Sequence, residues 1–329
     1  MLSAPDFQKK QIVFVFFNEG EKLSFQNDNL LVKTAEGKTK LQVTCYRLFL
    51  VFAVGHGSVT SVLIQKANQF GFMIALMTPG YRLYAMLGNA KEGNTLLHKK
   101  QYAYTGLDIA KHIVANKISA QYRQLMEVRN KTPQLQEALL QLKNCYEQAE
   151  TVTELHSLLA YEGIASKVYF ARHFEGIPWQ GRQPRIKKDN INSILDIGYT
   201  LLFTYLDALL SAFGFDTYCG VYHTMFYMRK SLVCDMVEPF RCLIDKAVKK
   251  AYNLKQIKEE DFLVKNHQYR LKWEKNAAYV GFLMAPIIEN KDEIFAYVQS
   301  YYRCFMKGTP VEQYPFYREG HTENGTRKL

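Results

Sequence analysis

The stretch Cys219 to Cys242, CGVYHTMFYMRKSLVCDMVEPFRC, places His223 ahead of two carboxylates, Asp235 and Glu238. On a helix, residues three apart share a face, so the two carboxylates point to the same side. An apolar stripe runs beside them, made of Leu232, Met236, Phe240, Leu243 and Ala247. Pro239 removes a backbone hydrogen bond and should kink the helix beside Glu238. The pattern predicts an acidic pair at the edge of a core, where a metal site can form, although a solvated acidic face would show the same spacing.

Length and charge limit the classes to which this chain can belong. At 329 residues it suggests two domains, and 48% hydrophobic residues are ample for a core. The 42 Lys and Arg residues exceed the 31 Asp and Glu residues and give a net charge of +11. Such an excess favours a polyanionic partner, either nucleic acid or a membrane surface, although solubility alone could account for part of it.

Cysteine usage and hydropathy indicate a cytoplasmic protein. Six scattered cysteines form no Cys-x-x-Cys pair and are typical of reduced thiols. The first residues lack the basic-then-apolar plan of a signal peptide. The most apolar long stretch, Ile197 to Phe213, is interrupted by Asp207, so we expect a buried core helix and no membrane span.

The two halves of the chain differ in their periodicity. Residues 11–90 consist mainly of short apolar or alternating runs separated by turn residues, with one helical pattern at Ser61 to Phe70. From about residue 95 the pattern is helical, including residues 260–306. The sequence therefore predicts an α+β protein: a small β-rich, β-sandwich-like domain over residues 1–92, a larger all-α domain over 93–318, and a disordered tail over 319–329.

The helical half carries a carboxylate on an apolar face. A helix beginning with a capping box, Thr151 to Glu154, would turn Glu162 to the same side as Leu155 and Tyr169. A carboxylate turned into a core needs a cation, hydrogen bonds or a metal, and a plain salt bridge explains Glu162 as well as a metal does. Together with His223, Asp235 and Glu238, however, it supplies the oxygen and nitrogen donors suited to Mg²⁺ or Mn²⁺.

A polar loop, Gly176 to Lys188, lies between the helix expected to carry Glu162 and the helix expected to carry His223. Its basic side chains surround one aromatic residue; they are Arg182, Arg185, Lys187 and Lys188 around Trp179. Cations that hold phosphate and an indole that stacks on a base suit a nucleic-acid strand. A mobile, solvated loop with a partly buried Trp179 is an equally good explanation.

Several ordered blocks resemble those of a known family, the CRISPR-associated adaptation integrase or "Cas-one" protein. The blocks are Glu162-Gly163-Ile164-Ala165 with Tyr169-Phe170, Arg182-Gln183-Pro184, Asp189-Asn190-Ile191-Asn192, Gly198-Tyr199-Thr200-Leu201-Leu202, Gly214-Phe215-Asp216, Gly220-Val221-Tyr222-His223 and Ser231 to Arg241. They follow the family's order over about 80 residues, and the plan of a β-rich part before a helical part fits the whole chain.

The resemblance implies a site, a metal and partners. Glu162, His223 and Glu238 would be the ligands of Mg²⁺ or Mn²⁺, with Asp235 as a further acidic residue of the catalytic site. Some family members carry aspartate at the position of Glu238, which affects ligand distances and leaves the role unchanged. The N-terminal domain would form a homodimer, the helical domain would be catalytic, and a smaller second CRISPR adaptation protein would bridge two dimers on double-stranded DNA, both the incoming fragment and the repeat.

The implied reaction is attack of a DNA 3′-hydroxyl on a repeat phosphodiester, with a metal that stabilises charge on the phosphate oxygens. Arg182, Arg229 and Arg241 are candidates to position phosphate, although an ordinary salt bridge explains Arg241 equally well. Two alternatives remain open. One is a metal-dependent nuclease that acts on branched or single-stranded DNA, and the other is a non-catalytic DNA-binding scaffold.

Overall fold

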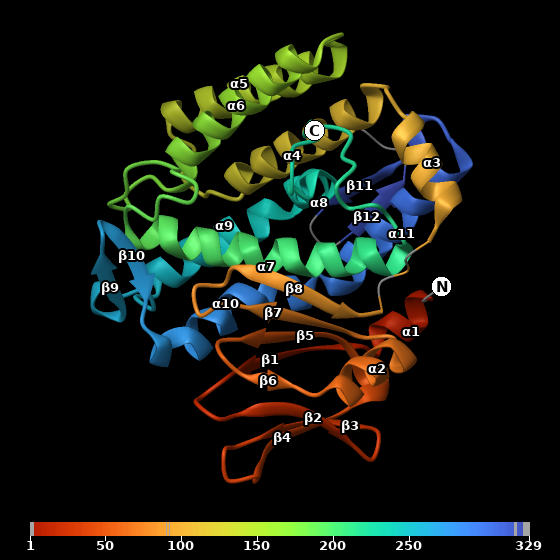
Figure 1. Ribbon diagram of the computed structural model, residues 1–329. Helices are drawn as coiled ribbons and strands as arrows, with labels where there is room; N and C mark the ends of the chain where they lie inside the picture. The colour runs from red at the N-terminus through yellow and green to blue at the C-terminus, as the bar shows by residue number, and fades with distance from the viewer. Residues whose placement is uncertain (1–2, 90, 92, 319–320, 325–329) are drawn as a thin grey trace. The chain divides into compact units, whose positions relative to one another are not determined.

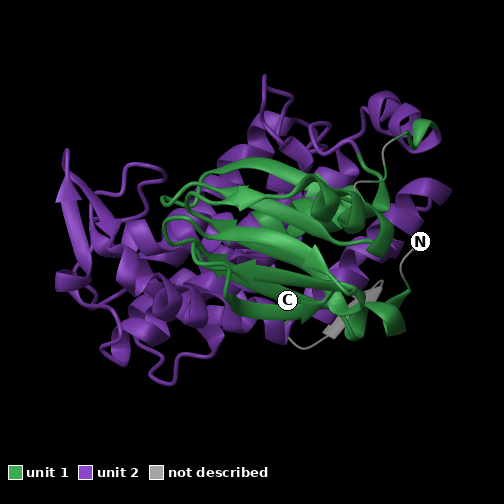
Figure 2. Cartoon of the chain, turned by 60° about the horizontal axis from the view of Figure 1, so that its bottom comes forward, with its two compact units in different colours: residues 1–95, 204–215 green, residues 96–203, 216–329 purple. Residues whose placement is uncertain are grey.

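The computed structural model describes residues 3–89, 91, 93–318 and 321–324. Figure 1 labels its helices and strands along the chain. The chain divides into two compact units, one formed by residues 1–95 and 204–215 and the other by residues 96–203 and 216–329 (Figure 2). Each unit is described below by itself.

Two four-stranded sheets build the first unit. One has the order β1-β5-β7-β8, in which β1, β5 and β7 are parallel and β8 is antiparallel, and the other has the order β4-β3-β2-β6. The bounds of the elements are α1 Ala4–Gln8, β1 Gln11–Phe16, β2 Lys22–Gln26, β3 Asn29–Lys33, β4 Thr39–Thr44, β5 Leu48–Val54, β6 Ser58–Val59, α2 Ser61–Phe70, β7 Met73–Met77 and β8 Leu83–Gly88.

The core of this unit explains its continuous apolar runs. Every residue of β5 is buried, because this strand lies between two parallel neighbours. One hydrophobic cluster joins side chains of both sheets, such as Val51 and Leu30, with Leu63 and Ala67 of α2. The predicted β-rich, two-sheet N-terminal region of an α+β fold is confirmed.

The second unit is mostly helical. Its elements are α3 Thr95–Ala103, α4 Asp108–Met126, α5 Pro133–Thr151, α6 Leu155–His173, α7 Asn190–Phe213, α8 Ser231–Val237, α9 Arg241–Asn253, β9 Phe262–Lys265, β10 Gln268–Leu271, α10 Asn276–Glu289, α11 Lys291–Lys307, β11 Pro315–Arg318 and β12 His321–Asn324, with Thr95 and the second half of α7 counted in the first unit. Helices α4, α5 and α6 pack side by side around one hydrophobic cluster that includes Val114, Leu142 and Tyr169.

Helix α7 is long and apolar enough to cross a membrane by length and composition, and 83% of its most apolar window is buried inside the protein. Such burial is typical of a core helix, which is what the sequence predicts for Ile197 to Phe213. Gly198 on this helix allows close packing, because a β-carbon there would lie 2.5 Å from Cγ2 of Ile244 in α9.

The structure corrects several local predictions. The predicted capping box is wrong: Thr151 is the last residue of α5, and Glu154 is the N-cap of α6 without a side-chain cap bond. Residues 262–271 were expected to be helical, yet they form the β9–β10 hairpin, whose turn residues Asn266 and His267 both have positive φ. In the predicted tail, residues 321–324 pair with β11 through backbone hydrogen bonds, and residues 319–320 and 325–329 lie outside the described residues.

Candidate active site

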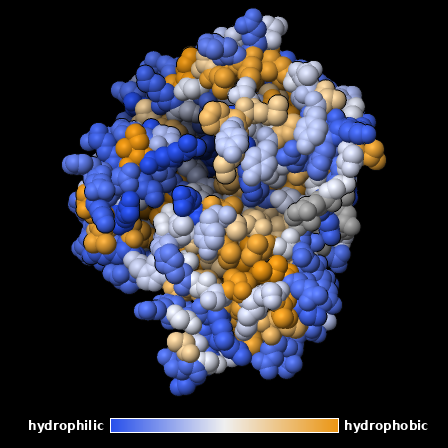
Figure 3. All heavy atoms as spheres, viewed as in Figure 1, coloured by the Kyte–Doolittle hydropathy of each residue, from blue (hydrophilic) through white to orange (hydrophobic). Residues whose placement is uncertain are grey.

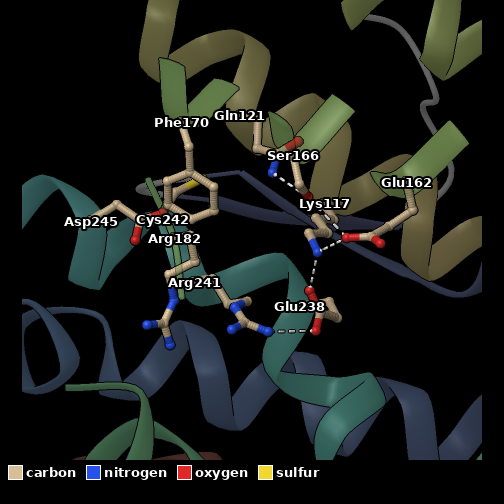
Figure 4. Close-up of a pocket in the computed structure, with 10 residues that line it drawn as sticks. All are labelled: Lys117, Gln121, Glu162, Ser166, Phe170, Arg182, Glu238, Arg241, Cys242 and Asp245. Atoms are coloured by element: carbon tan, nitrogen blue, oxygen red, sulfur yellow. Dashed lines mark hydrogen bonds and ion pairs between the residues drawn. The ribbon is translucent and has the colours of Figure 1, made fainter. Parts of the chain in front are cut away.

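Two carboxylates meet from separate elements of the second unit. Glu162 belongs to α6, and Glu238 opens a 3₁₀ turn, Glu238–Phe240, between α8 and α9. That turn is the predicted break at Pro239, and it brings the Glu238 side chain to 4% exposure. The ammonium of Lys117, on α4, lies between them and forms ion pairs with both, at 2.6 Å from Oε2 of Glu238 (Figure 4). Glu162 and Glu238 therefore form a carboxylate–lysine–carboxylate bridge with Lys117, whereas Asp235, the other member of the predicted acidic pair, contacts His223.

Lys117 and Glu238 in this bridge shift each other's pKa. Burial by itself would raise the pKa of Glu238, but Arg241 and Lys117 hold it at about 2. Burial would lower the pKa of Lys117, but the carboxylates of Glu238 and Glu162 raise it above its ordinary value. Nη1 of Arg241 donates to Oε1 of Glu238 over 2.8 Å. Glu238 therefore uses one oxygen for each cation and stays ionised at neutral pH.

Asp235 positions His223 and the backbone around it. Oδ1 of Asp235 lies 2.8 Å from both the backbone nitrogen and Nδ1 of His223, while Oδ2 accepts the backbone N–H groups of Val221 and Tyr222. Asp235 itself is fully buried. Because a carboxylate only accepts, Nδ1 carries the proton in this contact, and Nε2 of a neutral ring keeps its lone pair.

Gly220 is required by this arrangement. A β-carbon at Gly220 would lie 2.7 Å from Oδ2 of Asp235 and 2.8 Å from Cβ of Ser231. The Gly220-Val221-Tyr222-His223 block therefore has a glycine where a larger side chain would clash with the Asp235 carboxylate.

A cavity of about 170 Å³ adjoins the bridge (Figure 4). It is lined by side chains of α4, α6, α9 and the loop before α7; they are Lys117, Gln121, Glu162, Ser166, Phe170, Arg182, Glu238, Arg241, Cys242 and Asp245. The view of Figure 3, taken from the same side as Figure 1, shows a hollow with hydrophilic atoms on the face of this unit. A pocket with three cations and three carboxylates can hold both a cation and the anionic oxygens of a phosphate.

Asp245 lies on the α9 side of the cavity. Its carboxylate accepts the hydroxyl protons of Tyr169 and Tyr199. Burial raises its pKa to about 6, against the opposing effects of the Tyr199 hydrogen bond and of Arg241. The guanidinium groups of Arg241 and Arg182 lie over the Tyr199 ring, at 4.4 Å and 5.1 Å from its centroid.

The basic residues predicted to hold DNA occupy different environments. Arg182 lines the cavity, but it is paired with Asp196 at 2.6 Å and with Asn192 at 3.1 Å. Arg229 lies in the loop after His223, where it donates to the carbonyl of Thr224, and it does not line the cavity. Of the predicted phosphate-positioning residues, Arg182 and Arg241 thus line the cavity, and Arg241 also contacts Glu238 of the bridge.

In the predicted nucleic-acid loop, Gly176 to Lys188, some of the side chains proposed to bind DNA are packed against the protein. Trp179 is half-buried, and its ring centroid lies 4.6 Å from that of Phe174 and 5.8 Å from that of Phe170. The carbonyl of Lys187 accepts the N–H of Tyr269 in β10, and burial lowers the pKa of the Lys187 amine, whereas Lys188 is exposed. The packed tryptophan agrees with the alternative of a partly buried ring.

Two features of the site escaped the sequence interpretation. Lys117 was recognisable by the signal that revealed Glu162: it shares a helical face with Ile113, Val114 and Gln121, which are all buried. The second is an exposed apolar run, Met225 to Met228, directly after His223. Four consecutive large side chains show neither helical nor strand periodicity. In the sequence, only their position directly after His223 would have pointed to them.

The carboxylate pair fits a cation, since the Lys117 ammonium lies where both carboxylates would place one. Carboxylate oxygens, to which an imidazole can add a nitrogen donor, suit Mg²⁺ or Mn²⁺. His223 contributes to the electrostatics of Glu238. Among the described residues, however, no three His, Cys, Asp or Glu side chains gather closely enough to form a metal site as they stand. The fit therefore rests on Glu162 and Glu238.

The chain is similar to known proteins over most of its length. The family model "CRISPR associated protein Cas1" matches residues 14–282. The "CRISPR-associated endonuclease Cas1 1" of Thermodesulfovibrio yellowstonii is 29% identical over 242 residues, which cover 70% of this chain and 76% of that protein. The "CRISPR-associated endonuclease Cas1" of Leptospira interrogans is 31% identical over 172 residues, which cover 48% of this chain and 68% of that protein.

Solved structures share the fold. A Cas1 protein from Thermotoga maritima superposes with a TM-score of 0.77 at 18% identity, covering 92% of this chain and 98% of that one. A chain of a "Cas6-RT-Cas1–Cas2 complex" gives a TM-score of 0.80 at 22% identity; the match covers 94% of this chain and 36% of that longer chain. The family model spans well over half of the sequence, and it names the family that the sequence blocks resemble. The chain therefore belongs to the Cas1 family of CRISPR-associated endonucleases.

Proposed function

We propose that this chain is a metal-dependent DNA integrase and endonuclease that inserts short DNA fragments into a CRISPR array. The observation that carries the proposal is the convergence of Glu162 and Glu238 on one cation position beside a cavity that Arg182 and Arg241 also line. Membership of the Cas1 family supports the reaction class.

The side chains have distinct proposed roles. Glu162 and Glu238 hold Mg²⁺ or Mn²⁺, and His223 contributes Nε2, with Asp235 fixing the ring through Nδ1. The metal, when bound, polarises the scissile phosphate and stabilises negative charge on its oxygens. Arg241 orients Glu238, and Arg182 sets the positive potential of the same cavity.

The proposed partners follow the relatives. A homologous chain has been solved in a complex with Cas2, and we propose that this chain likewise works as a homodimer with the smaller adaptation protein on double-stranded DNA. The excess of basic residues supports binding of the DNA backbone. Its six cysteines, all in the described part of the chain and none in a disulfide, favour the reducing cytoplasm.

The test is the joining of a labelled short duplex with free 3′-hydroxyls to a supercoiled plasmid that carries a CRISPR repeat, with partner protein and Mn²⁺. Wild type should join the duplex, whereas Glu162→Gln, Glu238→Gln and His223→Ala should not. Glu147→Gln is the matched control, because Glu147 is an exposed carboxylate on α5 that pairs only weakly with Lys143. Joining by all three site variants would refute the proposal, and metal-dependent cutting without joining would favour the nuclease.

A further inference from the structure

Lys117 is the one residue of the bridge to which the proposed reaction gives no role. It projects from the core-facing side of α4 and is 7% exposed. Its helical neighbours Ile113, Val114 and Ile118 are packed in the core. A lysine in such a place is rarely found without compensating charge, and here the compensation consists of the two proposed metal ligands.

The contacts show which oxygens the ammonium uses. It pairs with Oε1 of Glu162, an oxygen that also accepts from Ser166 at 2.9 Å, and with Oε2 of Glu238. Arg241 takes the other oxygen of Glu238. Among the described residues, Lys117 alone therefore forms ion pairs with both carboxylates, and its ammonium links α4, α6 and the 3₁₀ turn.

We propose that Lys117 is a built-in cation that keeps Glu162 and Glu238 together in the metal-free protein, and that a divalent metal enters the site by displacing its ammonium. The inference rests on the proposed metal-dependent function and deepens it. Metal loading is then an exchange of one cation for another at a site that is already formed.

Electrostatics requires such an exchange. Glu238 is buried and Glu162 is only partly exposed, so the two carboxylates repel each other unless a cation lies between them, and Lys117 supplies that cation before the metal arrives. Once a divalent ion occupies the same position, an ammonium within ion-pair distance of the same oxygens faces a like charge in a poorly screened environment. Both cations cannot remain in contact with the carboxylate pair.

The cavity supplies a place for the displaced side chain. Gln121 lies one helical turn after Lys117 on α4 and lines the same 170 Å³ cavity. Its Nε2 contacts Oγ of Ser166 at 3.4 Å, while its buried Oε1 accepts no hydrogen bond from the described residues. That amide oxygen is an acceptor ready for an ammonium that leaves the carboxylates.

The first test measures Mn²⁺ binding by full-length Lys117→Met, using titration calorimetry and electron paramagnetic resonance. Methionine is unbranched like lysine and nearly as long, and it carries no charge. Because the metal no longer competes with an ammonium, the Kd should become smaller by about tenfold or more. Lys111→Met is the matched control, since Lys111 is on the same helix and pairs with Asp108 outside the site, and its Kd should equal that of wild type. An unchanged or weaker affinity of Lys117→Met overturns the inference.

The second test uses wild type and does not depend on the folding of a variant. Reductive methylation followed by mass spectrometry reports whether the Lys117 amine is held by the carboxylates. Lys117 should be protected without metal and methylated several-fold faster at saturating Mn²⁺, while the exposed Lys143 should react alike in both conditions. Continued protection of Lys117 at saturating Mn²⁺ overturns the inference.

The outcomes separate this inference from the proposed function. If wild type binds Mn²⁺ and joins DNA but Lys117→Met binds Mn²⁺ no more tightly, the exchange is wrong and the integrase stands. If wild type binds no Mn²⁺, both are wrong.

Discussion

Oδ1 of Asp235 lies 2.8 Å from Nδ1 of His223 and equally close to the backbone nitrogen of the same residue. One carboxylate thus fixes both the ring and the chain that carries it. Asp235 was expected to be a further acidic residue of the catalytic site, and its two oxygens accept hydrogen bonds from four donor groups of residues 221–223. Its role in the structure is to orient His223.

Asp235→Asn should therefore disturb both the orientation of the His223 ring and the backbone of residues 221–223. An amide has only one acceptor oxygen, so it cannot serve all four donors. We expect joining and metal affinity to fall by about 10–100-fold, as for other residues that orient a ligand. The assay is the DNA-joining rate with Mn²⁺ titration. Asp216→Asn is the control, since Asp216 accepts from Tyr102 and Tyr218 at the beginning of the same segment; equal losses in the two variants would contradict the orienting role.

Replacing Arg241 should destabilise the folded protein. Glu238 is buried, and in the described part of the chain Arg241→Met would leave it with one ion-pair partner, Lys117. Breaking a buried ion pair from one side costs about 3–5 kcal/mol, so the free energy of unfolding should fall by roughly that amount in urea titrations. Arg172→Met, which removes an exposed pair with Glu175 on α6, should change it by less than about 1 kcal/mol. Similar values for the two variants would show that the Glu238 pair is not buried in solution.

Two glycines of the family-like blocks should respond to alanine in opposite directions. In Gly220→Ala the new β-carbon would overlap Asp235 and Ser231, and overpacking of this kind costs about 1–3 kcal/mol. In Gly163→Ala the β-carbon meets nothing within 4 Å in the middle of α6, so the variant should be stabilised by about 0.5–1 kcal/mol. Thermal unfolding of both variants measures the difference. Destabilisation of Gly163→Ala would indicate that its surroundings are more crowded than the structure shows.

Much of the fold was predictable from the spacing of apolar residues. In the β-rich region they alternate with polar residues or form continuous runs, and in the helical region they recur with helical periodicity. The break at Pro239 was also predictable, since proline cannot donate to the helix. The β9–β10 hairpin was not, because its two-residue turn uses Asn266 and His267 without a glycine. Within the site, sequence spacing identified the carboxylates. It could not reveal that Lys117, 45 residues before Glu162, pairs with it, because tertiary packing alone brings α4 against α6.

The last prediction concerns two buried groups that titrate in opposite senses. Burial raises the pKa of Asp245 from 3.8 to about 6, so its contribution to stability is complete below pH 3.8 and is lost as the pH rises through 6. Burial lowers the pKa of His173 from 6.5 to about 4, so its contribution is complete above pH 6.5 and is lost as the pH falls through 4. Differences of this size between the folded and unfolded pKa correspond to about 3 kcal/mol for each group.

Between pH 4 and 6.5 these two contributions therefore oppose each other in wild type, and single substitutions should separate them. Asp245→Asn removes the acid and leaves His173, so stability should rise as the pH increases across this window. His173→Phe keeps a ring stacked on Tyr169 and leaves Asp245, so stability should fall over the same window. Urea unfolding of both variants and of wild type at several pH values measures the slopes. Parallel slopes for the two variants would mean that at least one of these groups is accessible to water in the folded protein.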